Sequence, residues 1–273
     1  MKLNKNFFKM STPLIMGVCN ITKDSFSDGG KYYKNLSALA HIKKMYKNGA
    51  NIIDIGAEST RPGSDPVSYK YEIKKIGGLL DKLPKNKFII SIDTNKIETQ
   101  EYVLKKGAHL INDIMGGSEE LFYLTKKFNS GLIIMHTPAA PKIMQTKTKD
   151  YKNIYSDIKN YFKKRIRIIE KYKISPKKVW LDPGIGFGKN VNQNLKLIKN
   201  IKKFRINNYG LLLGTSRKSW ISNIHKSDVN NRLGGSLASI IYSLDNSVDM
   251  YRVHDVFETI QAIEVYNKIK CSR

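Results

Sequence analysis

The sequence predicts a (β/α)8 TIM barrel that forms a single domain over residues 1–273, with its core between about residues 13 and 270. Short apolar runs rich in β-branched residues alternate eight times with longer amphipathic stretches, as parallel strands alternate with covering helices. Polar residues follow nearly every apolar run. In a barrel the carboxyl ends of all strands meet at one mouth, whereas an open doubly wound sheet gathers such residues near one switch point. The spread of polar endings therefore favours the closed barrel.

Each predicted strand is a short apolar run bounded by polar residues or glycine. In chain order these runs cover residues 14–19, 51–56, 88–93, 109–113, 131–136, 178–182, 210–214 and 249–254. Each predicted helix has apolar residues at spacings of three, four and seven, which places them on one helix face. The helices cover residues 36–48, 68–82, 96–106, 118–128, 153–172, 191–203, 231–243 and 256–269. Glycines 49, 107 and 210 lie just before strands, where helix C-termini commonly end in glycine.

Composition limits the classes of partner. The formal net charge of +25 suggests nucleic acid, but the lysines are spread along almost the whole chain. The densest basic stretch, residues 163–178, has apolar residues at helical spacing, so we expect a solvated helix face and no nucleic-acid partner. We also expect no membrane association, since no apolar run reaches 18 residues. Cys19 and Cys271 lie far apart in no CxxC pattern, which fits a reducing cytoplasm.

The stretch DPGIGFGK at residues 182–189 looks like a phosphate-binding loop. A Walker A motif would need glycine at Pro183 and a hydroxyl residue at Asn190, and the G-x-G-x-x-G spacing fails as well. We expect a steric role instead. Glycines after Asp182 would let the backbone turn tightly and approach a ligand closely. Phe187 could then lie against a flat ring.

The polar strand endings suggest the chemistry of a ligand. Asp93, Asn112 and Asp182 can pair with the donor and acceptor edge of a flat, polar heterocycle, because a carboxylate accepts two parallel N–H bonds. Positive side chains follow other strands and suit phosphate or carboxylate groups; they are Arg61, Lys218, Arg252 and His254. The sequence has no G-x-S-x-G elbow, HExxH motif or Cys/His cluster. It therefore predicts neither a nucleophilic triad nor a zinc site.

These residues lie in segments that resemble the dihydropteroate synthases, folate-pathway enzymes of the pterin-binding barrel family. The resemblance covers the chain in order from about residue 13 to about residue 270. Its segments are MGVCNITKDSFSDGG (16–30), GANIIDIGAESTRPG (49–63), SIDT (91–94), INDIMGG (111–117), LDPGIGFGK (181–189), GTSRKSWI (214–221) and YRVHDV (251–256). DSFSDGG, ESTRPG and GTSRKS are specific to the synthases. Lys23 and Ala57 depart from the family pattern, which has Pro and Gly there.

The resemblance implies that p-aminobenzoate is joined to 6-hydroxymethyl-7,8-dihydropterin diphosphate, with release of diphosphate. The residues expected to hold the pterin are Asp93, Asn112, Asp182 and Lys218, with Met135, Phe187 and Gly214 forming its slot. Arg252 and His254 would bind the diphosphate, and Asn20 and Asp28 would bind Mg²⁺. The p-aminobenzoate pocket would be shaped by Phe26, Thr60, Arg61, Pro62 and Ser219. The family is commonly dimeric and is the target of sulfonamides, so we expect a homodimer.

The residues expected to act in catalysis are Asp93, Asp182, Lys218, Arg252 and His254. A pterin-dependent methyltransferase on the same barrel is the alternative, since it would share the Asp and Asn strand endings. Such an enzyme has no use for a diphosphate clamp, so Lys218, Arg252 and His254 favour the synthase. His136 follows the fifth predicted strand, and its role at the mouth is open.

Overall fold

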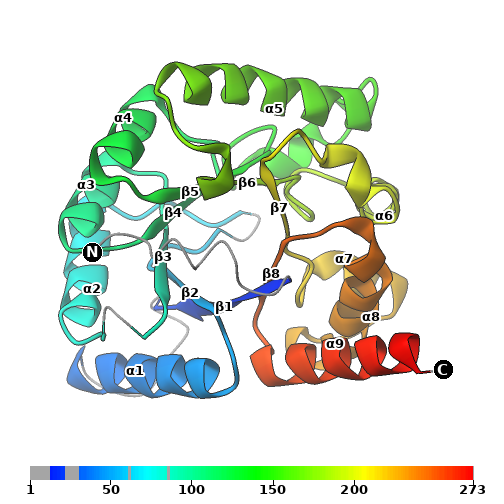
Figure 1. The fold of residues 1–273 in the computed structure, drawn as a ribbon, viewed down its shortest axis with the longest axis horizontal. Coiled ribbons are helices and arrows are strands. Elements are labelled where there is room, and N and C mark those ends of the chain that lie inside the picture. The colour runs from blue at the N-terminus through cyan, green and yellow to red at the C-terminus, as the bar shows by residue number, and fades with distance from the viewer. Residues whose placement is uncertain (1–12, 22–30, 61–62, 85–86, 273) are drawn as a thin grey trace.

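A computed structural model of the chain describes residues 13–21, 31–60, 63–84 and 87–272. Eight parallel strands form a closed barrel in chain order, and β1 pairs with β8 to close it (Figure 1). The strands are β1 (Leu14–Asn20), β2 (Ile52–Gly56), β3 (Ile89–Asp93), β4 (Leu110–Asp113), β5 (Gly131–Met135), β6 (Val179–Asp182), β7 (Gly210–Leu213) and β8 (Met250–Val253). The predicted fold class is confirmed, and each strand lies within two residues of its predicted bounds.

The helices form a ring around the barrel (Figure 1). They are α1 (Lys31–Lys47), α2 (Tyr69–Leu80), α3 (Ile97–Lys105), α4 (Glu119–Phe128), α5 (Ile154–Lys171), α6 (Val191–Lys199), α7 (Ser219–Ile224), α8 (Leu233–Ser243) and α9 (Val256–Cys271). Helix α7 was not predicted from the sequence, because six residues are too short to show helical periodicity. The predicted helix 191–203 is wrong at its end, since α6 stops at Lys199 and a 3₁₀ turn (Ile201–Phe204) follows.

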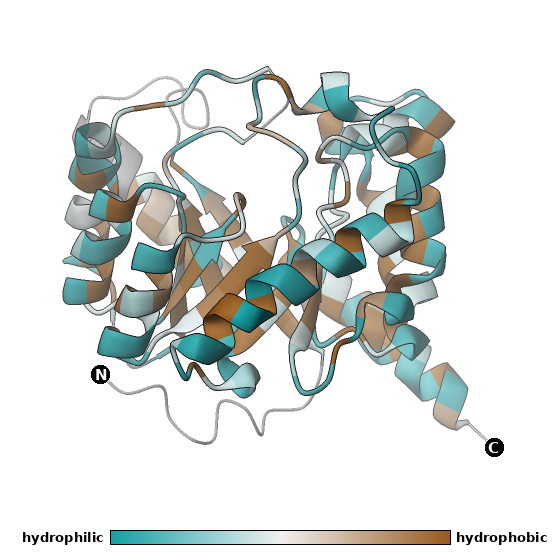
Figure 2. Ribbon diagram, turned by 90° about the horizontal axis from the view of Figure 1, so that it is seen from above, coloured by the Kyte–Doolittle hydropathy of each residue, from teal (hydrophilic) through white to brown (hydrophobic). Residues whose placement is uncertain are grey.

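Two apolar layers stabilise the barrel. The inner layer fills its lower interior and contains Leu14, Met16, Ile52, Leu110, Ile133, Trp180, Leu212 and Met250. The outer layer lies between the sheet and the helices and includes Ile53, Ile90 and Leu181, which point the opposite way from their neighbours in the same strands. Figure 2 shows the apolar strands inside and mixed polar and apolar faces on the helices. Trp180 is the largest side chain of this inner layer and is buried.

The helices carry both polar and apolar faces (Figure 2). In the described part of the chain, no helix combines the length and apolar composition needed to span a bilayer. Their buried faces are accounted for by packing on the barrel, as in α5, where Ile158, Phe162 and Ile166 lie on one side.

Candidate active site at the barrel mouth

The inward face of the strands changes from apolar to polar toward the carboxyl ends. Side chains two residues apart in a strand share a face. The inner-layer residues Ile52, Leu110, Trp180 and Met250 are therefore followed, two positions on, by the inward-facing residues Asp54, Asn112, Asp182 and Arg252. The same parity makes Gly214 and His254 inward-facing at the ends of β7 and β8. The polar residues thus stand on a packed apolar floor, at the end of the barrel where active sites lie.

Asp54, in the middle of β2, connects several of these residues. Its carboxylate is fully buried and accepts hydrogen bonds from Ser91 Oγ at 2.7 Å, Asn112 Nδ2 at 3.0 Å and Arg252 Nε at 2.7 Å. Arg252 also donates from Nη2 to Asp93 Oδ2 at 2.7 Å. The sequence analysis missed Asp54 because it lies within an apolar run rather than at its end. A single carboxylate among isoleucines was the available signal, since a buried charge requires a partner.

Burial and neighbouring charges shift the pKa values of this network. Loss of hydration raises the pKa of the Asp93 carboxyl to about 7; Arg252 opposes this shift, and the negative charge of Asp54 adds to it. Burial alone would lower the pKa of the Arg252 guanidinium, but Asp54 and Asp93 outweigh it and raise the pKa above its ordinary value. Arg252 therefore stays charged, while Asp93 is poised to gain or lose a proton near neutral pH.

A second group of side chains surrounds Gly214. A methyl group placed there would lie 3.7 Å from Arg252 Cβ, 3.9 Å from Lys218 Nζ and 4.0 Å from Asp182 Oδ2. The other oxygen of Asp182, Oδ1, accepts a hydrogen bond from the Gly184 N–H at 2.7 Å. Asp182 at the end of β6 and Lys218 after β7, both predicted to hold the pterin, therefore meet Arg252 of β8, predicted to bind the diphosphate, around one glycine.

Lys218 links this group to the loop after β6. Its ammonium donates to the Ile185 carbonyl and lies 4.8 Å from the centroid of the Phe187 ring, within the range of a cation–π interaction. Burial lowers the pKa of Lys218 to about 8, although the nearby Asp182 acts to raise it. Burial raises the pKa of the Asp182 carboxyl, although Lys218 acts to lower it. Phe187 and Lys218 thus form one wall of the mouth, as the sequence suggested for Phe187.

His254 differs in charge from the sequence expectation. Its Nδ1 lies 3.1 Å from Ser216 Oγ, and its backbone N–H donates to the same oxygen at 3.2 Å. Burial, and next the positive charge of Arg252, lower the pKa of the imidazole to about 3. A lowered pKa favours the neutral imidazole at physiological pH, whereas the sequence suggested a positive side chain at this position. The side chain can still bind a ligand through a hydrogen bond.

The remaining predicted residues fall into three sets. Asn20 and Asp93 lie on either side of Gly56, where an added methyl would be 3.5 Å from Asn20 Oδ1 and 3.4 Å from Asp93 Cβ. Met135 is buried and pairs in register with Asp182, whereas Thr60 is half-buried and Ser219 is exposed at the start of α7. Four predicted residues lie outside the described residues: Phe26, Asp28, Arg61 and Pro62.

His136, whose role was open, does not face the mouth. Its ring lies against Tyr151 and Tyr161, and its Nδ1 is 3.3 Å from Lys189 Nζ beneath the loop that follows β6. Burial lowers the pKa of its imidazole to about 3. Within the described residues there is also no cluster of three or more His, Cys, Asp or Glu side chains that could hold a metal by itself.

Comparison with known proteins agrees with this arrangement. The family described as pterin binding enzyme matches residues 16–254. The chain belongs to this family. Dihydropteroate synthase of Escherichia coli (strain K12) is 39% identical over 259 residues, which cover 94% of this chain and 91% of the relative.

Solved structures of family members have the same fold. A Yersinia pestis dihydropteroate synthase in a sulfonamide drug complex superposes with a TM-score of 0.88 at 34% identity, covering 95% of both chains. A Burkholderia cenocepacia dihydropteroate synthase complexed with 7,8-dihydropteroate gives a TM-score of 0.85 at 30% identity, covering 95% of this chain and 92% of that one. Within the family, the chain is thus grouped with dihydropteroate synthases.

Proposed function

We propose that the barrel mouth joins p-aminobenzoate to 6-hydroxymethyl-7,8-dihydropterin diphosphate, giving 7,8-dihydropteroate and diphosphate. The observation that carries this proposal is the meeting of Asp182, Lys218 and Arg252 around Gly214. A carboxylate that can accept hydrogen bonds from a heterocycle therefore lies close to cationic side chains that can bind a diphosphate, so one ligand can contact both. Membership of a family whose relatives include a 7,8-dihydropteroate complex supports the same reaction.

The pterin would lie against Gly214, between Asp182 and the wall formed by Phe187 and Lys218. Oδ1 of Asp182 accepts from Gly184, so Oδ2, which lies 4.0 Å from the methyl position at Gly214, can accept N–H groups of the heterocycle. Asn112 donates its Nδ2 to Asp54, which leaves its amide oxygen as the acceptor for the ligand. Asp54 thereby orients an amide that could otherwise present either end. Met135 would close the slot from β5.

The diphosphate would bind near the ends of β1 and β8. Arg252 is fixed by Asp54 and Asp93 and brings a permanent positive charge, and neutral His254 can donate a hydrogen bond. Asn20 supplies a hard oxygen donor at the end of β1, which suits Mg²⁺, an ion that commonly takes one or two protein ligands together with substrate phosphates. Bound there with Asp28, Mg²⁺ would neutralise charge on the leaving diphosphate. This donor set fits the ion.

The residues would lower the barrier chiefly through electrostatics and positioning. Breaking the bond to diphosphate leaves positive charge at the methylene carbon, which the electron-rich dihydropterin can share. In their ionised forms Asp182 and Asp93 would stabilise that charge, and Arg252 would stabilise the departing diphosphate. The amine of p-aminobenzoate then requires correct placement more than a strong base. Thr60, Arg61, Pro62, Phe26 and Ser219 are the residues proposed to provide that placement.

A coupled assay tests the function directly. The protein, the pterin diphosphate, p-aminobenzoate and Mg²⁺ together should release diphosphate and form 7,8-dihydropteroate, and omission of either substrate should stop both. A chelator should suppress turnover if Mg²⁺ is required. Methyl transfer from methyltetrahydrofolate, with no condensation, would instead establish the alternative methyltransferase.

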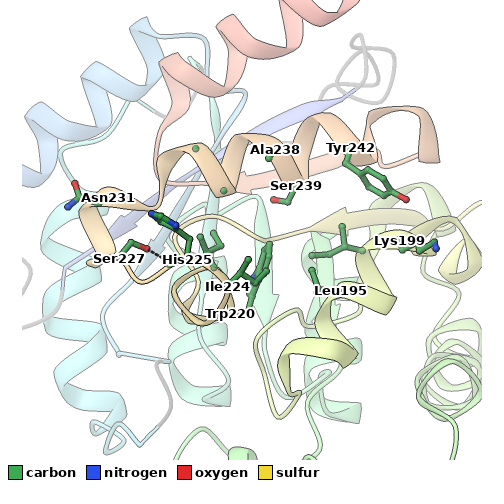
Figure 3. A pocket seen from close by; sticks show the side chains of 14 residues that line it. Leu195, Lys199, Trp220, Ile224, His225, Ser227, Asn231, Ala238, Ser239 and Tyr242 are labelled. Atoms are coloured by element: carbon green, nitrogen blue, oxygen red, sulfur yellow. Dashed lines mark hydrogen bonds between the residues drawn. The ribbon is translucent and has the colours of Figure 1, made fainter.

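We propose that the protein forms a homodimer through the outer face of α6, α7 and α8. This face carries an apolar groove lined by Leu195, Ile198, Trp220, Ile221, Ile224 and Tyr242, away from the barrel mouth (Figure 3). Ile224 and Tyr242 are 58% and 55% exposed, and large apolar surfaces of this kind commonly bind proteins. A second copy is the proposed occupant, because a groove beside protruding side chains can be self-complementary across a two-fold axis.

Light scattering tests the dimer. The wild type should have twice the mass of the chain, and Ile224→Asp should shift it to the monomer. Tyr123→Asp is the matched control, since Tyr123 on α4 is 55% exposed on another face. A monomeric wild type at micromolar concentration would contradict the proposal.

We also propose a reducing, cytoplasmic location, which the free thiols of Cys19 and Cys271 support.

A further inference from the structure

The loop after β6 encloses the side chain of the lysine that ends it. Lys189 is 3% exposed, and its Nζ lies 2.9 Å from the Gly184 carbonyl, 2.8 Å from the Phe187 carbonyl and 3.4 Å from the His136 carbonyl. His136 Nδ1 lies 3.3 Å away. The loop therefore turns carbonyl oxygens inward, whereas a phosphate-binding loop turns N–H groups inward. It is a cradle of acceptors, and the chain itself supplies the donor, the Lys189 side chain, whose pKa burial lowers to about 7.

The neighbouring groups of the same loop serve the pterin site. The Gly184 N–H donates to Asp182, the Ile185 carbonyl accepts from Lys218, and the Phe187 ring lies 4.8 Å from the Lys218 ammonium. Two lysines thus bind successive parts of one short loop, Lys189 from within and Lys218 from the mouth.

Several hydrogen bonds hold this glycine-rich loop in its shape. Gly184, Gly186 and Gly188 all have positive φ, at 71°, 83° and 59°, and glycine restrains the backbone less than any other residue. The Gly186 N–H donates to Asn194 at 2.7 Å and its carbonyl accepts from Gln145 at 3.0 Å, which fixes the middle of the loop. On either side, the Phe187 carbonyl accepts from Lys189, and the Gly184 carbonyl accepts from Lys189 and from the Phe187 N–H at 3.1 Å.

We propose that Lys189 is a positioning residue of the pterin site. Its ammonium draws the Gly184 and Phe187 carbonyls inward, and this holds Phe187 and the Ile185 carbonyl where they meet Lys218. Lys189 is buried and acts through the loop, without touching the substrate. The inference rests on the proposed function for its effect on substrate, but the effect on the loop is independent of any activity.

Lys189→Met tests the inference, because methionine has a similar length and no donor. We expect the KM for the pterin diphosphate to rise tenfold or more, while the KM for p-aminobenzoate stays within twofold. Lys189→Gln, which restores N–H donors without charge, should recover part of the loss. The charge-matched control is Lys196→Met, an exposed lysine on α6, which should behave as the wild type.

Hydrogen exchange of the amides at 184–188 in the ligand-free protein supplies the readout that needs no turnover. Exchange should accelerate in Lys189→Met within this loop and stay unchanged in β6 and α6. An equal rise in KM for both substrates, with faster exchange throughout the barrel, would show a general structural role and overturn the proposal. Wild-type KM values and wild-type exchange rates in the variant would overturn it as well. If Lys189→Met does not fold, the same criteria apply to Lys189→Gln. An inactive wild type would refute the proposed function alone, since the exchange result would still test Lys189.

Discussion

Gly214→Ala separates the proposed pterin site from the stability of the barrel. In the ligand-free structure the added methyl has its nearest neighbours at 3.7 Å, 3.9 Å and 4.0 Å, which are ordinary van der Waals distances. The φ angle at Gly214 is not positive, so alanine can adopt the same backbone. The protein alone therefore gives no steric reason for glycine at this position. A bound pterin would, because the methyl projects between Asp182, Lys218 and Arg252.

The expected effects of Gly214→Ala on the stability of the fold and on pterin binding differ in size and sign. A Gly→Ala change at a compatible position stabilises a protein by about 0.4–1 kcal/mol, through the unfolded chain. One extra methyl forced into a filled site typically costs about 1–3 kcal/mol. If that cost falls on the complex, pterin affinity decreases by about 5- to 150-fold. We thus expect a melting temperature equal to or above that of the wild type, together with much weaker pterin binding.

Calorimetric titration with 7,8-dihydropteroate, alongside thermal unfolding of the same samples, measures both quantities. Wild-type affinity in a folded Gly214→Ala protein would show that the pterin does not lie against β7 and would remove the central observation of the proposed site. A large loss of thermal stability would show that the packing around Gly214 is tighter than the distances indicate.

Three further changes test the surrounding residues. Asp182→Asn should abolish pterin binding in calorimetry, because an amide whose oxygen accepts from Gly184 would turn its NH2 group toward the ligand where Oδ2 accepts; wild-type affinity would rule out the anchoring role. Asp54→Asn should lower the free energy of unfolding by about 3 kcal/mol in urea titration, since it removes the buried carboxylate that pairs with half-buried Arg252; a change below the error of the titration would contradict this. Burial lowers the pKa of Lys218 to about 8, so its charge is lost as pH rises through that value, and pterin affinity should fall there. Lys218→Arg keeps its charge and should remove the fall; an identical pH profile would assign it to another group.

Much of the site was predictable because it follows from strand periodicity. Once eight parallel strands are recognised, the inward positions at their ends follow from the two-residue repeat, and Asp93, Asn112, Asp182 and Arg252 occupy them. Phe187 was expected at the mouth for a similar local reason, since it follows a strand in a glycine loop. The short helix α7 was not predictable, because six residues give too little periodicity.

The sequence by itself determined the order of the elements, the barrel class and the family, because each depends on local patterns and motifs that can be recognised without knowledge of the tertiary contacts. Only the tertiary structure decided which distant side chains meet. Arg252 and Asp54 are 198 residues apart and pair because β8 closes on β1 beside β2. The same closure places half-buried His254 beside Arg252, whose charge helps to lower the pKa of the imidazole. The fold of one loop likewise decided that DPGIGFGK binds its own lysine, because carbonyl direction depends on backbone angles that glycine leaves open.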